Sequence, residues 1–169
     1  PWILFLFFLP PSLKAFCFEA AGKEYRISPE LLTSIARVES GLNHKAVNTN
    51  KDGSSDLGLM QINSAWIDIL KLKRDELITD PCYNVMTGAG ILRRCIDRHG
   101  YTWESVGCYN AQSKGKREGY SWKIFHELKR EKARNMAKKR DVSPGAGSSV
   151  QSLQFRVRDA ENTDHKGKP

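Results

Sequence analysis

One carboxylate lies where a predicted helix should be apolar, and it is the first residue of this sequence that could do chemistry. Ser28 supplies an N-cap and Pro29 suits the first helical position, so the sequence predicts a helix over residues 29–40. At about 100° per residue, one face of this helix is apolar and carries Leu31, Ile35 and Val38. Glu39 falls within that face, where a core or a cleft is expected.

A carboxyl group in apolar surroundings has a specific chemical use. Loss of hydration raises its pKa, so Glu39 would stay protonated near neutral pH. A protonated carboxyl in an apolar cleft is the general acid that glycoside cleavage needs. The alternative is a glutamate at the edge of the face that reaches solvent past Leu32 and has no catalytic role.

The remaining elements must position this carboxyl group. Residues 43–57 are polar and rich in turn-forming types, which predicts a loop, or a small hairpin near 48–57 with its turn at Asp52-Gly53. Helices are predicted near 58–63 and 64–72, over 81–99 behind Asp80-Pro81, and over 103–112 behind Thr102. A last helix is predicted over 119–138, apolar at Trp122, Ile124, Phe125 and Leu128. The sequence thus predicts a mostly α-helical domain over residues 16–138.

Four cysteines, an even number, predict two disulfides in an exported chain. Cys82 and Cys95 would lie about 20 Å apart on one helix, too far for a bond that needs Cα atoms within about 7 Å. Of the pairings that remain we favour Cys17–Cys82 with Cys95–Cys108, because the second bond would join two helices across one turn. Free buried thiols are the alternative. The histidines and cysteines show no zinc-ligand spacing, so no metal site is predicted.

The N-terminal end of the sequence predicts export, and the C-terminal end predicts a tail. The apolar run from Trp2 to Leu9 indicates the partial signal peptide of a secreted protein over residues 1–15, with cleavage near Ala15. That run is too short to span a membrane, which takes about 20 residues. The positive charge is local: residues 114–140 carry 11 basic and 3 acidic side chains, and the rest of the chain is balanced. Residues 139–169 are predicted to be a basic helix end, a linker and a disordered tail.

Three short motifs resemble those of lytic transglycosylases. They are Glu39-Ser40-Gly41, Gly58-Leu59-Met60-Gln61-Ile62-Asn63 and Gly107-Cys108-Tyr109-Asn110-Ala111. Their order and spacing resemble the soluble lytic transglycosylase (SLT) domain over about residues 16–125. The likeness is greatest to small exported members that accompany type III secretion, pilus and conjugation machines, which share a cysteine near the mature N-terminus and the Asp-Pro-Cys seen here at 80–82.

The resemblance implies a lysozyme-like α fold with a cleft for peptidoglycan glycan strands. Glu39 matches the catalytic acid/base of the family, and the residues expected to bind the sugar are Gln61, Asn63, Tyr109 and Asn110. The implied reaction cleaves the bond between N-acetylmuramic acid (MurNAc) and N-acetylglucosamine (GlcNAc) with formation of a 1,6-anhydro ring. No cofactor is implied.

Two features depart from the family pattern. The third motif usually ends in Ala-Gly, whereas this chain has Ala111-Gln112. The stretch from Asn50 to Ser64 also resembles C-type lysozymes, in which the residue matching Asp56 is the second carboxylate of the two-carboxylate site that lysozyme exemplifies. Asp56 is therefore a second catalytic candidate, and lysozyme-type hydrolysis with Glu39 and Asp56 is the alternative reaction.

The expected partners follow from this reading. They are peptidoglycan glycan strands and components of a secretion, pilus or conjugation machine, with the protein in the periplasm. The basic segment 129–140 has almost no interleaved aromatic residues, so we expect no specific binding to nucleic acid, although a pure binding protein is a competing class. No phosphate-binding loop and no Gly-x-Ser-x-Gly turn is present.

Overall fold

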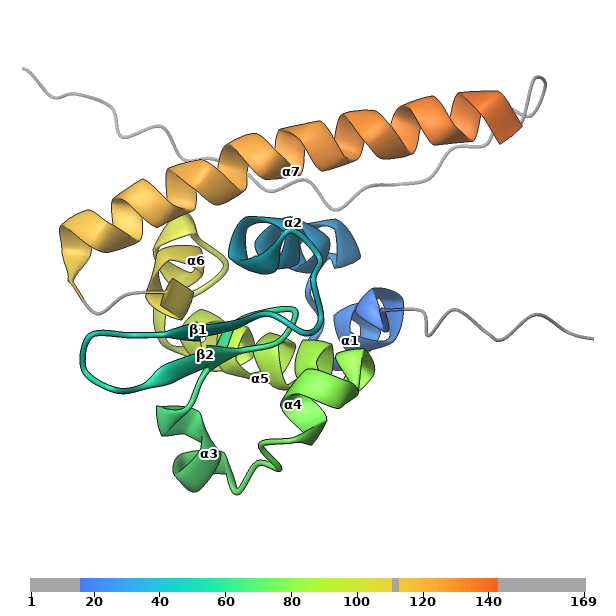
Figure 1. Cartoon of the computed structure of the whole chain (residues 1–169). Helices are drawn as coiled ribbons and strands as arrows, with labels where there is room; N and C mark the ends of the chain where they lie inside the picture. The colour runs from blue at the N-terminus through green and yellow to red at the C-terminus, as the bar shows by residue number, and fades with distance from the viewer. Residues whose placement is uncertain (1–15, 111–112, 143–169) are drawn as a thin grey trace, which may run out of the picture.

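The computed structural model describes residues 16–110 and 113–142 (Figure 1). The predicted signal peptide, Ala111-Gln112, and the predicted linker and tail from residue 143 onward lie outside the described residues. The elements are α1 (Phe18–Tyr25), α2 (Pro29–Ser40), β1 (Val47–Thr49), β2 (Ser55–Leu57), β3 (Ile62–Asn63), α3 (Ala65–Leu70), α4 (Glu76–Thr79), α5 (Pro81–His99), α6 (Trp103–Asn110) and α7 (Lys114–Val142). The fold is the mostly helical, lysozyme-like architecture that the sequence predicts.

Helix α2 forms as its end signals predict. The Ser28 hydroxyl oxygen accepts a hydrogen bond from the Leu31 amide at 3.3 Å, which satisfies one of the free donors of the first turn. Gly41 ends the helix in the left-handed conformation, with φ at 63°. Leu32 and Ile35 are fully buried, so the predicted apolar face packs into the core.

Helix α5 is the central helix of the core. The Asp80 carboxylate caps it by accepting from the amides of Cys82 and Tyr83, and Pro81 occupies the first position. Its buried face packs against α1, α4 and α6. Helix α7 runs across α2 and α6 on the opposite side of the molecule from α3 and α4 (Figure 1).

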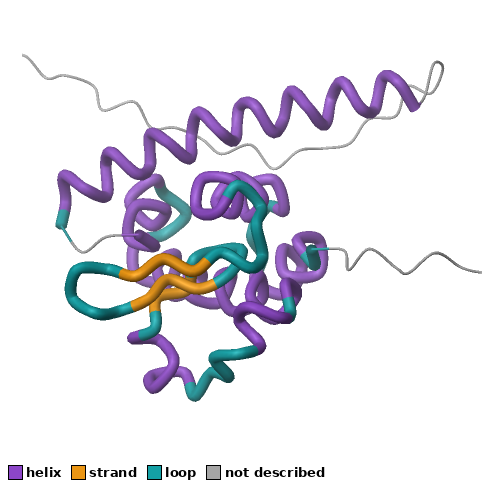
Figure 2. The backbone as a smooth tube through the Cα atoms, viewed as in Figure 1, coloured by secondary structure: helices purple, strands orange, loops and turns teal. Residues whose placement is uncertain are grey.

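The polar stretch after α2 forms a hairpin of two strands (Figure 2). A third short strand completes a small antiparallel sheet of order β1-β2-β3. Asp56 lies opposite Asn48 on one side and Asn63 on the other. Gly53 has φ at 83° in the turn, which a glycine adopts without strain. Of the two predicted states for residues 48–57, the hairpin is the one that forms.

The helix predicted near 58–63 is wrong. This segment is a turn followed by β3, with positive φ at Gly58 (74°) and Gln61 (49°). At Gly58 the backbone passes so close to its surroundings that a Cβ would lie 2.2 Å from the Leu77 carbonyl oxygen. The four large apolar residues of this segment are buried by neighbouring elements, so their hydrophobicity does not reflect a helical period; they are Leu57, Leu59, Met60 and Ile62.

The last helix is longer than predicted, and one of its four predicted apolar residues, Trp122, faces solvent. It extends from Lys114 to Val142, beyond both predicted ends. Ile124 is fully buried as expected, but Trp122 is 57% exposed and packs its ring on Phe125 and His126 at the surface. The inward face carries Tyr120, 6% exposed, in addition to Ile124 and Leu128. Two short helices, α1 and α4, carry weak signals and were not predicted.

Both favoured disulfides are present. Cys17 is bonded to Cys82 and thereby ties the start of α1 to α5, and Cys95 is bonded to Cys108 and joins α5 to α6. No free cysteine remains among the described residues. None of the helices in the described ranges has the length and apolar character needed to cross a bilayer.

Candidate active site

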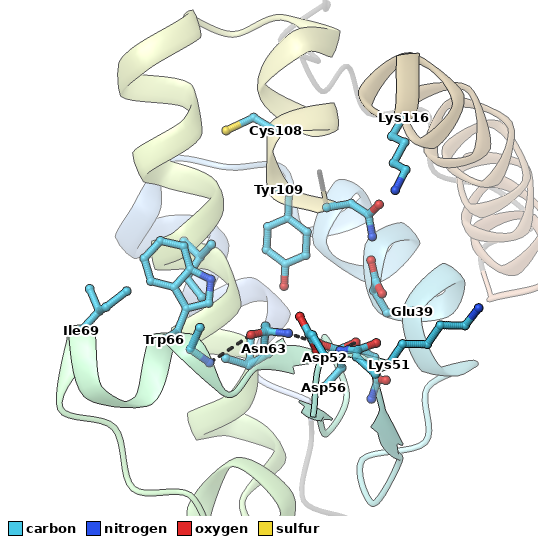
Figure 3. Close-up of a pocket in the computed structure, with 16 residues that line it drawn as sticks. Glu39, Lys51, Asp52, Asp56, Asn63, Trp66, Ile69, Cys108, Tyr109 and Lys116 are labelled. Carbon is cyan, nitrogen blue, oxygen red and sulfur yellow. Dashed lines mark hydrogen bonds between the residues drawn. The ribbon is translucent and has the colours of Figure 1, made fainter. Parts of the chain in front are cut away.

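A cleft of about 790 Å³ lies between the small sheet, α3 and the C-terminal end of α6 (Figure 3). All six residues that the sequence predicts for catalysis and sugar binding line it. The full lining is Glu39, Asn50, Lys51, Asp52, Asp56, Gln61, Ile62, Asn63, Ala65, Trp66, Ile69, Ile91, Cys108, Tyr109, Asn110 and Lys116. Residues from the first, second and third motifs therefore meet around one cavity.

Glu39 reaches the cleft from the last turn of α2 and is half-buried. Its pKa is raised from 4.5 to about 7, mainly by burial and also by the negative charge of Asp56. A hydrogen bond from Tyr120 and the charge of Lys123 act in the opposite direction. The predicted desolvated carboxyl is thus observed, and at neutral pH it exists in both protonation states.

Tyr120 on α7 holds the Glu39 carboxyl in place. Its hydroxyl donates to Glu39 Oε1 at 2.5 Å, and the ring is buried beneath the cleft. Burial, together with the Glu39 charge, keeps the pKa of Tyr120 well above its usual range, so the hydroxyl remains a donor. An ion pair of 2.8 Å between Arg37 of α2 and Glu131 of α7 fastens the two helices that carry this pair of residues.

Asp56 on β2 is held by two asparagine side chains. Asn63 Nδ2 donates to Asp56 Oδ1 at 2.8 Å, and Asn50 Nδ2 donates to Oδ2 at 3.0 Å. Asn63 also donates to Ser54 and accepts from the Ala65 amide, so its amide group is occupied by protein partners. Both oxygens of the Asp56 carboxylate are therefore fixed at the wall of the cleft.

Gln61 shapes the hairpin beside the cleft. Its Nε2 donates to the carbonyl oxygens of Gly58 at 2.8 Å and Ala46 at 3.3 Å, and its Oε1 accepts from Asn48 at 2.5 Å. These bonds stabilise the positive φ of Gln61 itself. The structure places Gln61 in the lining as predicted, with its amide group engaged in holding the second motif.

The second motif is anchored from beneath by Asn84 of α5. This fully buried amide accepts from the Met60 amide at 2.8 Å and donates to the carbonyl oxygens of Leu57 and Leu77. On the other side Ser40, which follows Glu39, donates to the Leu59 carbonyl oxygen at 2.7 Å. The first and second motifs are thus locked together by the backbone of the turn.

Tyr109 and Asn110 close the cleft from the end of α6. The Tyr109 hydroxyl donates to the Met60 carbonyl oxygen at 2.8 Å, which ties the third motif to the second. Burial, with the charges of Glu39 and Asp56 added, keeps the pKa of Tyr109 well above its usual range. Asn110 is exposed at the rim.

Sequence reasoning missed Tyr120 and Asn84. Tyr120, Ile124 and Leu128 are spaced by four residues, a pattern that predicts one shared face and could have indicated that Tyr120 is buried. Asn84 lies on the apolar face of α5, where a buried amide needs partners. Neither pattern reveals that the partner of Tyr120 is Glu39, because α2 and α7 are far apart in the sequence.

The described part of the chain offers no group of three or more His, Cys, Asp or Glu side chains arranged to hold a metal ion. Glu39, a carboxyl group near its pKa, thus shares the cleft with the fixed carboxylate of Asp56 and a set of fixed amides. This combination fits proton transfer to a glycosidic oxygen.

Comparison with known proteins identifies the family. The transglycosylase SLT domain matches residues 16–123. This chain belongs to the SLT transglycosylase family. Its activity is accordingly the lytic cleavage of peptidoglycan.

Proteins of several enteric bacteria are similar to this SLT domain over most of its length. Invasion protein IagB of Salmonella typhimurium is 40% identical over 130 residues, which are 73% of this chain and 81% of that protein. Protein IpgF of Shigella flexneri is 37% identical over 130 residues, 75% of this chain and 86% of its own. A peptidoglycan-binding-like protein of Escherichia coli O157:H7 is 40% identical over 123 residues, 64% of this chain and 74% of that protein.

Proposed function

We propose that Glu39 acts first as acid and then as base in cleavage of the MurNAc–GlcNAc bond. Its carboxyl proton passes to the glycosidic oxygen as the bond from that oxygen to C1 of MurNAc breaks, which leaves an oxocarbenium-like sugar. The Glu39 carboxylate then takes the proton of the sugar's own 6-hydroxyl as its oxygen bonds to C1. The products are a GlcNAc end with a free 4-hydroxyl and a 1,6-anhydro-MurNAc end, and Glu39 regains its proton.

The observation that carries this proposal is the half-buried Glu39 carboxyl in the cleft. Its pKa of about 7 means that both the acid and the base form are accessible near neutrality. The hydrogen bond from Tyr120 supports the same role, because it orients one oxygen and leaves the other for the substrate.

Asp56 is proposed to stabilise positive charge on the sugar ring. Its carboxylate is held in the cleft wall by Asn50 and Asn63, which suits a fixed charge. The same feature favours a second candidate reaction, lysozyme-type hydrolysis, in which Asp56 acts as nucleophile or charge stabiliser and water completes the cleavage.

We further propose that the enzyme acts in the periplasm and opens the wall locally for a secretion, pilus or conjugation apparatus. Two disulfides fit an oxidising compartment outside the cytosol. The similarity to Invasion protein IagB and Protein IpgF supports an association with such a machine, whose components would be partners.

The roles of the two carboxylates are tested by release of soluble fragments from purified peptidoglycan. Glu39→Gln should lower the rate by about a thousandfold, within the range for loss of a general acid, and Asp56→Asn by about tenfold to a hundredfold through lost charge stabilisation. Glu24→Gln and Asp75→Asn change exposed residues outside the cleft lining and serve as matched controls. Full activity of Glu39→Gln would refute the proposal.

A further inference from the structure

A second cavity of about 250 Å³ continues the catalytic cleft between α5 and α6. Four residues line both spaces, namely Trp66, Ile91, Cys108 and Tyr109. The wall that the two spaces share is therefore apolar and is braced by the Cys95–Cys108 disulfide. A chain that leaves the glycan cleft along this wall enters the second cavity directly.

The two connected spaces differ in charge. The cleft lining mixes three carboxyl groups with Lys51 and Lys116, whereas the lining of the second cavity contains Arg94, Arg98 and Arg117 and no carboxylate. Arg117 is already paired with Glu104 at 2.6 Å. The second cavity therefore presents only positive charge, which favours a negatively charged ligand group.

Arg94 and Arg98 supply the available charge. They are one turn apart on α5, so their side chains lie on the same side of the helix, and both are exposed. Neither forms an ion pair with any residue in the described ranges. By contrast, Arg93 on the same helix is paired with Asp97.

We propose that this cavity, hereafter the arginine subsite, binds carboxylates of the stem peptide that MurNAc carries. The inference rests on the proposed function, because it assumes that the glycan strand occupies the cleft. The stem peptide contains acidic residues and a C-terminal carboxylate, whereas the sugar hydroxyl and acetamido groups are uncharged. Guanidinium groups match carboxylates with paired N–H donors.

The dimensions and the wall fit such a ligand. Four extended residues span about 13 Å, enough to pass from one cavity into its neighbour. Trp66 and Ile91 offer apolar contact to the alanine methyl groups near the sugar. The arginines line the same cavity and would contact the carboxylates further along the peptide. The arginine subsite would make the enzyme prefer strands with stem peptides over strands without them.

Binding of soluble glycan fragments tests the proposal. Titration calorimetry is done in the Glu39→Gln background, so that the ligand is not consumed. The fragments are used with their stem peptides, and also after an amidase has removed the peptides. The lactyl carboxylate that this hydrolysis frees on MurNAc is capped as a methyl amide, so that the bare fragments are uncharged. The test variant adds Arg94→Ala and Arg98→Ala, and the control adds Lys132→Ala and Lys139→Ala, which remove the same charge from exposed positions of α7 outside both cavity linings.

We expect stem-bearing fragments to bind about tenfold more tightly than bare fragments, an advantage that two partly exposed ion pairs can supply. The arginine variant should lose this advantage and bind bare fragments unchanged, and the control should keep it. High salt should reduce the advantage.

Three results would overturn the inference. They are equal affinity for both fragments, an advantage that survives in the arginine variant, and equal weakening of both fragments by that variant. Failure of both fragments to bind the Glu39→Gln protein would instead count against the proposed glycan cleft itself. Arg98 lies in the last turn of α5 and also interacts with the helix dipole, so its removal can lower the stability of the protein. Urea unfolding of the arginine variant therefore shows whether a loss of affinity reflects the arginine subsite or a less stable fold.

Discussion

Replacing Tyr120 by phenylalanine should raise the pKa of Glu39 and move the pH dependence of the enzyme. The hydroxyl donates to Glu39 Oε1 at 2.5 Å, and this bond lowers the pKa of Glu39 against the effect of burial, with a net value of about 7. A hydrogen bond to a charged group contributes about 1.5–3 kcal/mol, and 1.36 kcal/mol corresponds to one pKa unit. Because water entering the site would replace part of this bond, we expect a rise of about one unit.

The direction of the shift in the pH profile follows from the role of Glu39 as an acid. Its protonated form is required for the first step, so kcat/KM falls as pH rises through the pKa of the free enzyme. The midpoint of this fall should move from about pH 7 to about pH 8 in Tyr120→Phe. Initial rates of fragment release across pH 5–10 would show it. Asp56→Asn should move the same midpoint toward acid, since the Asp56 charge raises the pKa of Glu39.

Tyr83→Phe is the matched control for this experiment. Tyr83 is half-buried, its hydroxyl accepts from the Lys73 amide, and it lies outside the cleft lining. Its pH profile should be that of the unmodified protein. An unchanged or acid-shifted midpoint in Tyr120→Phe would refute the view that this bond stabilises the Glu39 carboxylate.

Three further predictions concern stability, measured by urea unfolding. Because the pKa of Glu39 is raised on folding, the folded protein loses stability as pH rises from 4.5 to about 7. Glu39→Gln should therefore be more stable than the unmodified protein at pH 8, by up to about 3 kcal/mol, and should lose that advantage near pH 4.5. An advantage that does not depend on pH would contradict this prediction. Asn84→Ala leaves three backbone groups without their buried partner and should cost about 2–4 kcal/mol, so a loss below 1 kcal/mol would be inconsistent with the anchor. Removing the Cys17–Cys82 disulfide, which closes a loop of 65 residues, should lower the free energy of unfolding by about 4 kcal/mol. Removing Cys95–Cys108, which closes 13 residues, should lower it by about 3 kcal/mol. The reverse order would argue against the loop-entropy account.

The parts of the fold that the sequence predicts are those with local signals. Helix α2 has an N-cap serine, a first-position proline and a terminal glycine, and its bounds agree with the structure. Helix α5 is defined equally well by Asp80 and Pro81. The burial of Glu39 follows from its place on the apolar face of α2, a property of one helix alone.

The parts that escape prediction depend on contacts between distant segments. The turn at 58–61 has its conformation because Asn84 and the Leu77 carbonyl group leave room only for glycine. The face that α7 turns inward is set by α2, which lies some 80 residues earlier in the chain and supplies Glu39 to Tyr120. Periodicity within α7 can indicate that Tyr120 is buried but not that its partner is Glu39, and the surface cluster around Trp122 gives a competing apolar signal.

The central claim, that Glu39 drives intramolecular transglycosylation, is tested most directly by mass spectrometry of the fragments released from purified peptidoglycan. The disulfide-intact protein should release muropeptides lighter by one water than hydrolytic products, and Glu39→Gln should release none. Fragments with reducing MurNAc ends would contradict the claim and make the enzyme a hydrolase with Asp56 as its second catalytic carboxylate. Equal release by both proteins would contradict any role of Glu39 as the acid.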